Sequence, residues 1–158
     1  MELFIRVANL SDYESLRPLF RQVHDLHVAK RPDLYRENQI PVGKEAFESQ
    51  INDPRRHVFV AAAGAEIIGV AVTVEEDVTE NPFLVARKVL LVDSLCVLEA
   101  WRGMGVGRML MKSIMDFARS IHADAVELAV LEENASAISF YESIGMTTKS
   151  RKMEFGLK

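Results

Sequence analysis

Residues 91–110 read LVDSLCVLEAWRGMGVGRML, and this stretch decides the fold. Its first part is mostly apolar, as in a buried strand; glycines follow, and then a helix begins. The start of a helix offers backbone N–H groups without intrahelical partners and a partial positive charge, and glycines let the backbone close around an anion. The stretch therefore predicts a loop that holds a phosphate or pyrophosphate, with Arg102 and Arg108 beside it.

Two common nucleotide-binding loops do not fit these glycines. The dinucleotide fingerprint needs a glycine where Arg108 stands, and a Walker loop needs a Gly-Lys-Ser/Thr ending that this loop lacks. The pattern that matches is Arg102-x-x-Gly105-x-Gly107 directly after a strand, which resembles the pyrophosphate loop of the GNAT superfamily of acyl-CoA N-acyltransferases. Met104 departs from the Lys or Arg that many members carry. The alternative is a strand-to-helix turn without a ligand.

The resemblance implies a site for acetyl-CoA along this stretch. The loop would hold the pyrophosphate with Arg102, Gly103, Met104, Gly105, Val106, Gly107 and Arg108. In the GNAT fold the central strand parts from the next strand, and its free backbone groups bind the pantetheine amides; the matching residues are Leu95, Cys96 and Val97. A backbone N–H there would also stabilise the tetrahedral oxyanion. A covalent intermediate on Cys96 is disfavoured, because a lone buried cysteine usually serves as a small apolar side chain.

A second segment that resembles the family, residues 134–146, reads NASAISFYESIGM. It is similar to the GNAT pattern Asn-x-x-Ala-x-x-Phe-Tyr-x-x-x-Gly-Phe, with Met146 in place of the final Phe. The resemblance implies that Asn134 contacts the coenzyme A arm. It also implies that the Tyr141 hydroxyl lies near the thioester sulfur, as the general acid that protonates the departing thiolate. The alternative for Tyr141 is a core residue that packs its helix on the sheet.

Asp93 is the candidate for the base that takes a proton from the acceptor amine. It lies among apolar residues of the central strand, where an unpaired carboxylate is costly. Burial with few partners would raise its pKa and make it a competent base. The alternative, which the residues leave open, is an aspartate paired with an arginine or a backbone donor. Glu132 and Glu133 are weaker candidates that are expected in solvent.

The acceptor site has no specific motif. His27, Arg31 and Tyr35 lie on the helix and loop that border the acceptor pocket in this fold, so we expect them to shape it. Their basic character would suit an acceptor that carries a carboxylate. His24 and His27 share a helix face, but a third ligand at a suitable spacing is missing, so we expect no metal.

Composition limits the class of protein. The 158 residues suit one domain, 1–158, and 49% apolar with 27% charged residues is typical of a soluble globular protein. A net charge of −4 argues against a nucleic-acid partner, and no apolar stretch is long enough to cross a membrane. A single cysteine and a start unlike a signal peptide indicate a reducing, cytoplasmic location. The sequence leaves a homodimer open.

Apolar periodicity predicts the order of strands and helices. The expected strands are residues 3–7, 57–62, 67–74, 88–98, 125–131 and 147–155. The first expected helix begins at a capping box of Ser11 and Glu14, and the other expected helices are 44–51, 108–121 and 134–144. Gly69 is expected beside a bulge, and residues 75–82 in a surface loop. This order predicts a mixed α/β fold of the GNAT type: a mostly antiparallel sheet with a central parallel strand–helix–strand crossover and helices on both faces.

Together these features predict an N-acetyltransferase that transfers an acetyl group from acetyl-CoA to a primary amine, by direct attack in a ternary complex. The alternative is a non-catalytic sensor or interaction module of the same fold that binds acyl-CoA without turnover. The presence of both Tyr141 and Asp93 favours the enzyme. The acceptor stays open among small polyamines, amino acids, antibiotics and protein amines.

Overall fold

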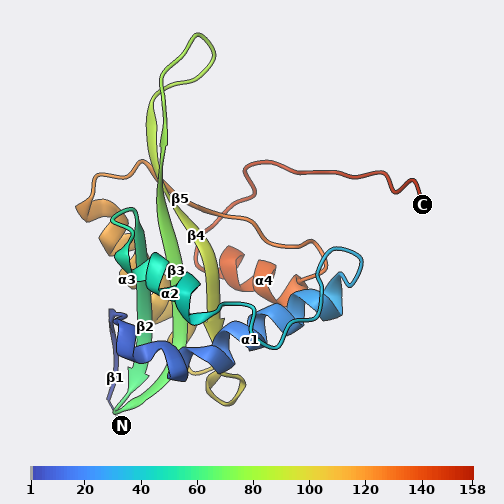
Figure 1. Cartoon of the computed structure of the whole chain (residues 1–158). Helices are drawn as coiled ribbons and strands as arrows, with labels where there is room; N and C mark the ends of the chain where they lie inside the picture. The colour runs from blue at the N-terminus through green and yellow to red at the C-terminus, as the bar shows by residue number, and fades with distance from the viewer. Residues whose placement is uncertain (1) are drawn as a thin grey trace.

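The computed structural model describes residues 2–158, which form a five-stranded sheet with helices on both faces (Figure 1). The strands, in their order across the sheet, are β1 (Leu3–Val7), β2 (Arg56–Ala63), β3 (Glu66–Val78), β4 (Arg87–Val97) and β5 (Ala125–Leu128). Neighbouring strands are antiparallel, except that β4 and β5 are parallel. The expected mixed sheet with one parallel crossover is confirmed.

Four helices cover this sheet: α1 (Tyr13–Lys30), α2 (Lys44–Asn52), α3 (Val106–Ser120) and α4 (Ala135–Ser143). Leu16 of α1 and Phe47 of α2 belong to the apolar core on one face. Leu110 and Ile114 of α3 belong to the core on the other face, against which α4 also packs. Because both faces are covered, the middle strands are apolar on both sides, as in a buried sheet.

β4 carries the two irregularities that shape the site. Its register with β3 shifts by one residue at Asp93, which is left as an extra residue in a β-bulge. β4 also pairs with β5 only over residues 89–92, although β4 itself continues to Val97. Residues 93–97 therefore have no neighbouring strand on the β5 side. We call this unpaired edge the β4 gap.

Two local expectations at the start of the chain and in β3 are wrong. The side chains of Asn9 and Asp12 form the capping box, because a short 3-10 turn (Leu10–Asp12) precedes α1 and moves the cap toward the N-terminus. β3 continues to Val78, through the first part of the expected loop, because it stays paired with the start of β4. The bulge beside Gly69 is confirmed, with Ile68 as the extra residue.

The expected last strand, residues 147–155, is also wrong. After α4 the chain continues as a segment without helix or strand that runs away from the body of the molecule (Figure 1). We call residues 147–158 the C-terminal tail. Its apolar side chains Met153, Phe155 and Leu157 are 88%, 88% and 90% exposed. The alternation that predicted a strand is present, but within residues 2–158 the tail pairs with no strand.

Candidate functional site

The glycine-rich loop leads from β4 into the start of α3, as expected. Gly103 and Gly105 adopt φ angles of 78° and 84°, which favour glycine, and Gly105 is the N-cap of α3. The helical ladder starts with the bond from Met109 N to Gly105 O at 3.0 Å. The N–H groups of residues 106–108 precede this ladder, so they are available to an anion.

Gly107 has a different role from the other two glycines. A Cβ atom at Gly103 or Gly105 would meet nothing within 4 Å, whereas one at Gly107 would lie 3.1 Å from the ring of Phe140 in α4. Gly107 therefore permits the close approach of α3 and α4. The two sequence segments that resemble the family meet at this contact.

The basic side chains beside the loop differ in their surroundings. Arg108 donates a hydrogen bond from Nη2 to Ser143 Oγ at 3.1 Å, so it links α3 to α4. Arg108, Lys112 and Ser143 line a cavity of about 400 Å³ between these helices. Met104, at the position where many family members carry a cation, is 61% exposed.

The free backbone groups of the β4 gap belong to alternate residues. Leu98 N donates to Ile68 O at 2.8 Å, so Leu98 turns its backbone groups toward β3, and by alternation so does Cys96. Leu95 and Val97 therefore turn theirs toward the gap. Of the three residues expected to bind pantetheine through the backbone, Leu95 and Val97 thus face the gap, and their contact with pantetheine stays a prediction.

Gln22 of α1 reaches the same edge, and sequence reasoning missed it. Its Nε2 donates to Val97 O at 2.8 Å and lies 3.2 Å from Cys96 Sγ. The only signal was a polar residue on the apolar face of α1, which no motif marks. The Cys96 thiol is buried, and burial is the main cause that raises its pKa to about 11. A thiol that stays protonated is a poor nucleophile, which agrees with the expectation that Cys96 forms no acyl intermediate.

Tyr141 and Asn134 both lie at α4. Tyr141 packs beside Phe140 with 5.3 Å between ring centroids, against the core that contains Leu110. Burial raises the pKa of the Tyr141 hydroxyl above its usual value, so the hydroxyl keeps its proton at neutral pH. Asn134 Oδ1 accepts a hydrogen bond from Ala137 N at 3.2 Å and caps α4. This cap is a structural role, and a contact of Asn134 with coenzyme A stays a prediction.

The buried, unpaired carboxylate expected at Asp93 is wrong. The side chain is 41% exposed, and its Oδ2 accepts a hydrogen bond from Arg56 Nη1 at 2.9 Å. The bulge explains the difference, because the extra residue leaves the regular alternation of inward and outward side chains. The structure thus has the ion pair that sequence reasoning held as the alternative. The role of Asp93 as a base stays a prediction, without the burial that first supported it.

A second cavity, of about 250 Å³, lies on the α1 face of the sheet beside the bulge. We call it the acceptor pocket. Its apolar walls are Phe20, Val23, Pro41, Val42 and Val72, and its polar walls are His24, His27, Gln50, Asp93 and Ser94. Gln50 Oε1 and Ser94 Oγ are buried without a hydrogen-bond partner. A buried polar atom without a partner is costly, so both atoms suggest a polar ligand.

The three residues expected to shape the acceptor site fall into different places. His27 lines the pocket, and burial is the main cause that lowers its pKa. Tyr35 is not among the lining residues; its ring packs against His27 with 4.9 Å between centroids. Arg31 binds Asp33, Glu133 and Glu154 at distances from 2.6 to 3.3 Å. The expectation that Arg31 offers its charge to an acceptor is therefore unsupported, because three carboxylates already surround it.

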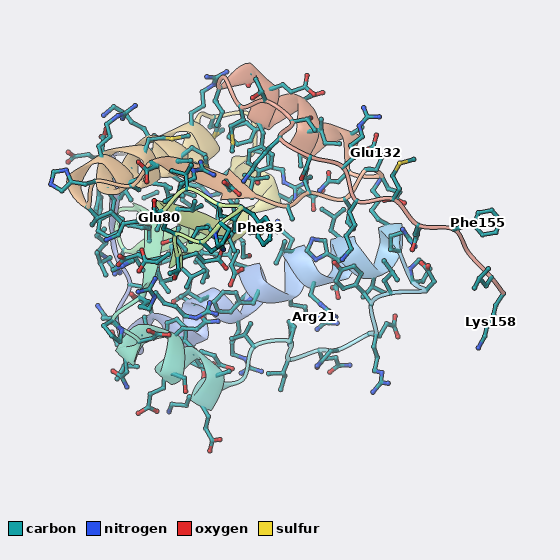
Figure 2. The ribbon with its side chains drawn as sticks, turned by 90° about the horizontal axis from the view of Figure 1, so that it is seen from above. Arg21, Glu80, Phe83, Glu132, Phe155 and Lys158 are labelled. Carbon is teal, nitrogen blue, oxygen red and sulfur yellow. The ribbon has the colours of Figure 1, made fainter. Side chains whose placement is uncertain are left out.

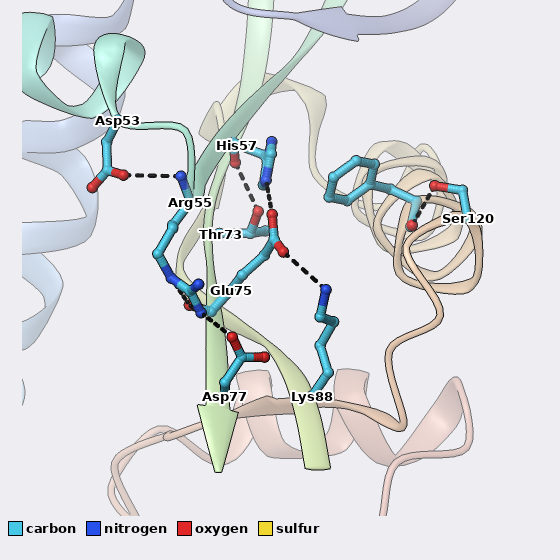
Figure 3. A network of polar contacts seen from close by, with 9 residues as sticks. Asp53, Arg55, His57, Thr73, Glu75, Asp77, Lys88 and Ser120 are labelled. Carbon is cyan, nitrogen blue, oxygen red and sulfur yellow. Dashed lines mark hydrogen bonds and ion pairs between the residues drawn. The ribbon is translucent and has the colours of Figure 1, made fainter. Parts of the chain in front are cut away.

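A further cluster of charged residues lies at the other end of β4 (Figure 3). His57 Nε2 and Glu75 Oε2 are 2.7 Å apart, and Lys88 Nζ is 3.5 Å from Glu75 Oε1. The hydrogen bond with His57 is the main cause that lowers the pKa of Glu75. Lys88 lies near the start of β4, whereas the glycine-rich loop follows the end of β4. This cluster is therefore separate from the candidate site.

Residues 2–158 contain no group of three or more His, Cys, Asp or Glu side chains arranged to hold a metal ion. None of the described helices combines the length and the apolar character that a membrane span requires.

Comparisons with known proteins agree on one family. The model of the acetyltransferase (GNAT) family matches residues 20–146. L-amino acid N-acetyltransferase AaaT of Escherichia coli K12 is 26% identical over 162 residues, which cover 99% of this chain and 90% of that protein. N-alpha-acetyltransferase RimI of Mycobacterium tuberculosis H37Rv is 31% identical over 100 residues, which cover 63% of this chain and 58% of that protein.

Solved structures agree with this result. A variant of the BH1408 protein of Bacillus halodurans superimposes with a TM-score of 0.96 at 31% identity, over 98% of this chain and 99% of that one. An aminoglycoside N-acetyltransferase in complex with CoA shares the fold, with a TM-score of 0.76 at 18% identity over 98% and 94% of the two chains. The chain therefore belongs to the GNAT family of acetyltransferases, and it is an N-acetyltransferase that uses acetyl-CoA.

Proposed function

We propose that this enzyme acetylates the α-amino group of a small acceptor, an amino acid or the N-terminus of a peptide, by direct transfer in a ternary complex. The observation that carries the proposal is the acceptor pocket, which opens beside the β-bulge of β4 and holds two unpartnered polar atoms. The names of the two curated relatives point to the same acceptor chemistry, since one acts on L-amino acids and the other is an N-alpha-acetyltransferase.

The acetyl-CoA site uses the loop and the β4 gap. Residues 106–108 at the start of α3 would bind the pyrophosphate through backbone N–H groups, and Arg102 would add charge. Leu95 and Val97 would hold the pantetheine arm as a neighbouring strand would. The residues fit this ligand because no strand pairs with β4 on this side from residue 93 to residue 97, although Gln22 already binds Val97 O, and because the space around Gly103 and Gly105 is open. When bound, acetyl-CoA supplies an acetyl thioester at the gap.

The proposed reaction needs an acid and an oxyanion donor. A backbone N–H of the β4 gap, from Leu95 or Val97, would stabilise the developing oxyanion. The Tyr141 hydroxyl, which is protonated at neutral pH, would donate its proton to the departing thiolate.

The acceptor amine must lose a proton before it attacks, because the α-amino group at the N-terminus of a peptide has a pKa of about 8 and is mostly protonated at neutral pH. We propose that Asp93 attracts the ammonium form and takes the proton, directly or through water. Ser94 Oγ and Gln50 Oε1 would accept hydrogen bonds from the amine or its neighbouring amide. These three residues come from β4 and α2 and line one pocket.

The size of the pocket favours a small acceptor. Its volume of about 250 Å³ lies below the roughly 300–1,000 Å³ of pockets for drug-sized ligands. The α-amine and apolar side chain of one amino-acid residue suit the walls around Phe20 and Val72. The cytoplasmic location expected from the single cysteine is part of this proposal.

A panel of amines tests the acceptor class. Acetyl-CoA is incubated with free amino acids, short peptides with an apolar first residue, the same peptides blocked at the N-terminus but carrying a lysine, and an aminoglycoside. Release of free thiol is measured. We expect turnover with α-amines only. Turnover with the lysine peptide or the aminoglycoside and none with α-amines would contradict the proposed acceptor.

A further inference from the structure

A side chain of the same chain, Gln22, reaches into the β4 gap. Gln22 lies in the middle of α1, one residue after Arg21, which projects from this helix into solvent (Figure 2). The half-buried side chain of Gln22 extends to the end of β4, where its Nε2 donates a hydrogen bond to Val97 O at 2.8 Å. A side-chain amide thus takes one of the backbone positions that no strand pairs with.

Both hydrogen atoms of the Gln22 amide nitrogen have an acceptor. One is donated to Val97 O, and the other is donated to Cys96 Sγ, 3.2 Å from the same nitrogen. A sulfur atom is a weak acceptor, whereas a backbone carbonyl is a strong one. Cys96 therefore orients the amide, and the stronger hydrogen bond goes to the carbonyl of Val97.

Val97 O stands at the entrance of the β4 gap. The glycine-rich loop, where the pyrophosphate would bind, follows Val97 after a short 3-10 turn (Glu99–Trp101). Asp93 and the acceptor pocket lie at the other end of the gap. An arm that joins a pyrophosphate at the loop to a thioester beside Asp93 therefore passes Val97 O first.

The Gln22 amide and an amide of pantetheine would use the same position. A donor prefers to lie near the plane of the carbonyl group that it meets. A donor 2.8 Å from an oxygen that points into the gap therefore occupies space that a neighbouring strand would use. Pantetheine contains amide bonds, and their N–H groups are donors of the same kind as the Gln22 side chain. The two donors are thus alternatives at Val97 O.

We propose that Gln22 is a gate at the β4 gap: its amide holds Val97 O until an amide of the pantetheine arm of acetyl-CoA displaces it. This inference rests on the proposed binding of pantetheine along the gap. Before the exchange, the gate gives the carbonyl a partner and blocks the strand edge against other extended segments. A thioester must bring its own amide to replace the lost hydrogen bond, so Gln22 selects acyl donors that are built on pantetheine.

Calorimetry with coenzyme A and the variant Gln22→Met tests the gate. Methionine has a similar length but no donor, so the arm no longer has to break a hydrogen bond when it binds. We expect coenzyme A to bind about 2- to 10-fold more tightly, which corresponds to the net worth of one hydrogen bond. Gln39→Met is the matched control, because it makes the same change at an exposed loop position and should leave the affinity unchanged.

The sign of the effect separates a gate from a structural contact. Loss of a contact that only supports the site lowers affinity, whereas loss of a gate raises it. Unchanged or weaker binding of coenzyme A by Gln22→Met would show that Gln22 and the arm do not compete for Val97 O, and would overturn the gate.

A second ligand shows whether the effect acts through the arm. ADP carries a pyrophosphate but no pantetheine, so its affinity should be equal in the wild type and in Gln22→Met. An equal gain for ADP and coenzyme A would show a general change at the glycine-rich loop and would overturn the gate.

Hydrogen exchange separates failure of the gate from failure of the proposed acetyl-CoA site. If pantetheine binds along the gap, coenzyme A should protect the amides of Leu95 and Val97 in both the wild type and Gln22→Met. Protection without a gain in affinity overturns the gate alone. Absence of protection in both proteins removes pantetheine from the gap and overturns the gate together with the proposed acetyl-CoA site.

Discussion

Replacing Gly107 with alanine tests the contact that joins α3 to α4. The added Cβ atom would lie 3.1 Å from the Phe140 ring, so the ring must move by a few tenths of an ångström. Overpacking a core contact costs about 1–3 kcal/mol, and alanine returns up to about 1 kcal/mol of helix propensity. We therefore expect a net loss of stability of about 1 kcal/mol. For a chain of this length that corresponds to a Tm lower by about 2–4 °C.

Gly107→Ala should also lower the rate of turnover, and by more than its small loss of stability alone would cause. Tyr141 follows Phe140 in α4, and their ring centroids are 5.3 Å apart, so a displaced Phe140 also displaces Tyr141. Small misplacements of a reacting group can lower the rate by up to about 10²-fold. Thermal unfolding and initial rates with acetyl-CoA and a working amine measure the two effects.

A matched background shows whether the contact is the cause. Phe140→Leu removes the ring that the new methyl group would meet, so Gly107→Ala should cost little in that background. We expect a coupling energy of about 0.5–3 kcal/mol between the two sites, as for residues in contact. Additive effects of the two substitutions, or an unchanged Gly107→Ala enzyme, would refute the packing role of Gly107.

Four further substitutions test the site and the sheet. Gly105→Asp places a charge at the start of α3 and should weaken coenzyme A binding about tenfold or more; unchanged affinity by calorimetry in a folded variant removes the loop from the site. Tyr141→Phe keeps the packing and should lower kcat and kcat/KM together by about 10²- to 10⁴-fold; wild-type turnover when chemistry limits the rate makes solvent the acid. Asp93→Asn should lower the rate with little change in acetyl-CoA affinity; wild-type turnover with a lower Tm leaves only the ion pair with Arg56. Because the pKa of Glu75 is lowered from 4.5 in the folded state, its contribution to stability is complete above 4.5 and lost as pH falls through the folded pKa. Glu75→Gln should therefore make unfolding less pH-dependent in that range, and an unchanged pH dependence of Tm counts against the pairing with His57.

Local patterns were enough to predict the loop and most of the elements. Glycine spacing and a strand before a helix are short-range features, so Gly103 and Gly105 were placed correctly before α3. The gap beside β4 followed from the family resemblance, and the pairing of β4 with β5 then limited it to residues 93–97. Sequence reasoning did not show that Gly107 serves the contact with Phe140, because that depends on how two helices pack.

The errors arise from contacts between residues that are distant in sequence. Asp93 pairs with Arg56, and Arg31 with Glu133 and Glu154, and no periodicity reveals such pairs. The bulge that exposes Asp93 changes which side chains share a face of β4, so an argument from strict alternation fails there. Alternation in the C-terminal tail predicted a strand that the structure does not contain, because alternation supplies no neighbouring strand to pair with.

The uneven burial across the sheet also determines where the molecule opens first. We expect amides among the fully buried residues of β2–β4 to exchange only when the whole fold unfolds, and α4, which has no fully buried residue, to open at a smaller free energy. Tyr141 and the Asn134 cap belong to this less stable part. A ligand that binds only the closed form stabilises it by an amount that grows with the logarithm of 1 + [L]/Kd, where [L] is the concentration of free ligand. Acetyl-CoA should therefore protect α4 from proteolysis while leaving the central strands unaffected, so that heat inactivates the ligand-free enzyme before its fold is lost.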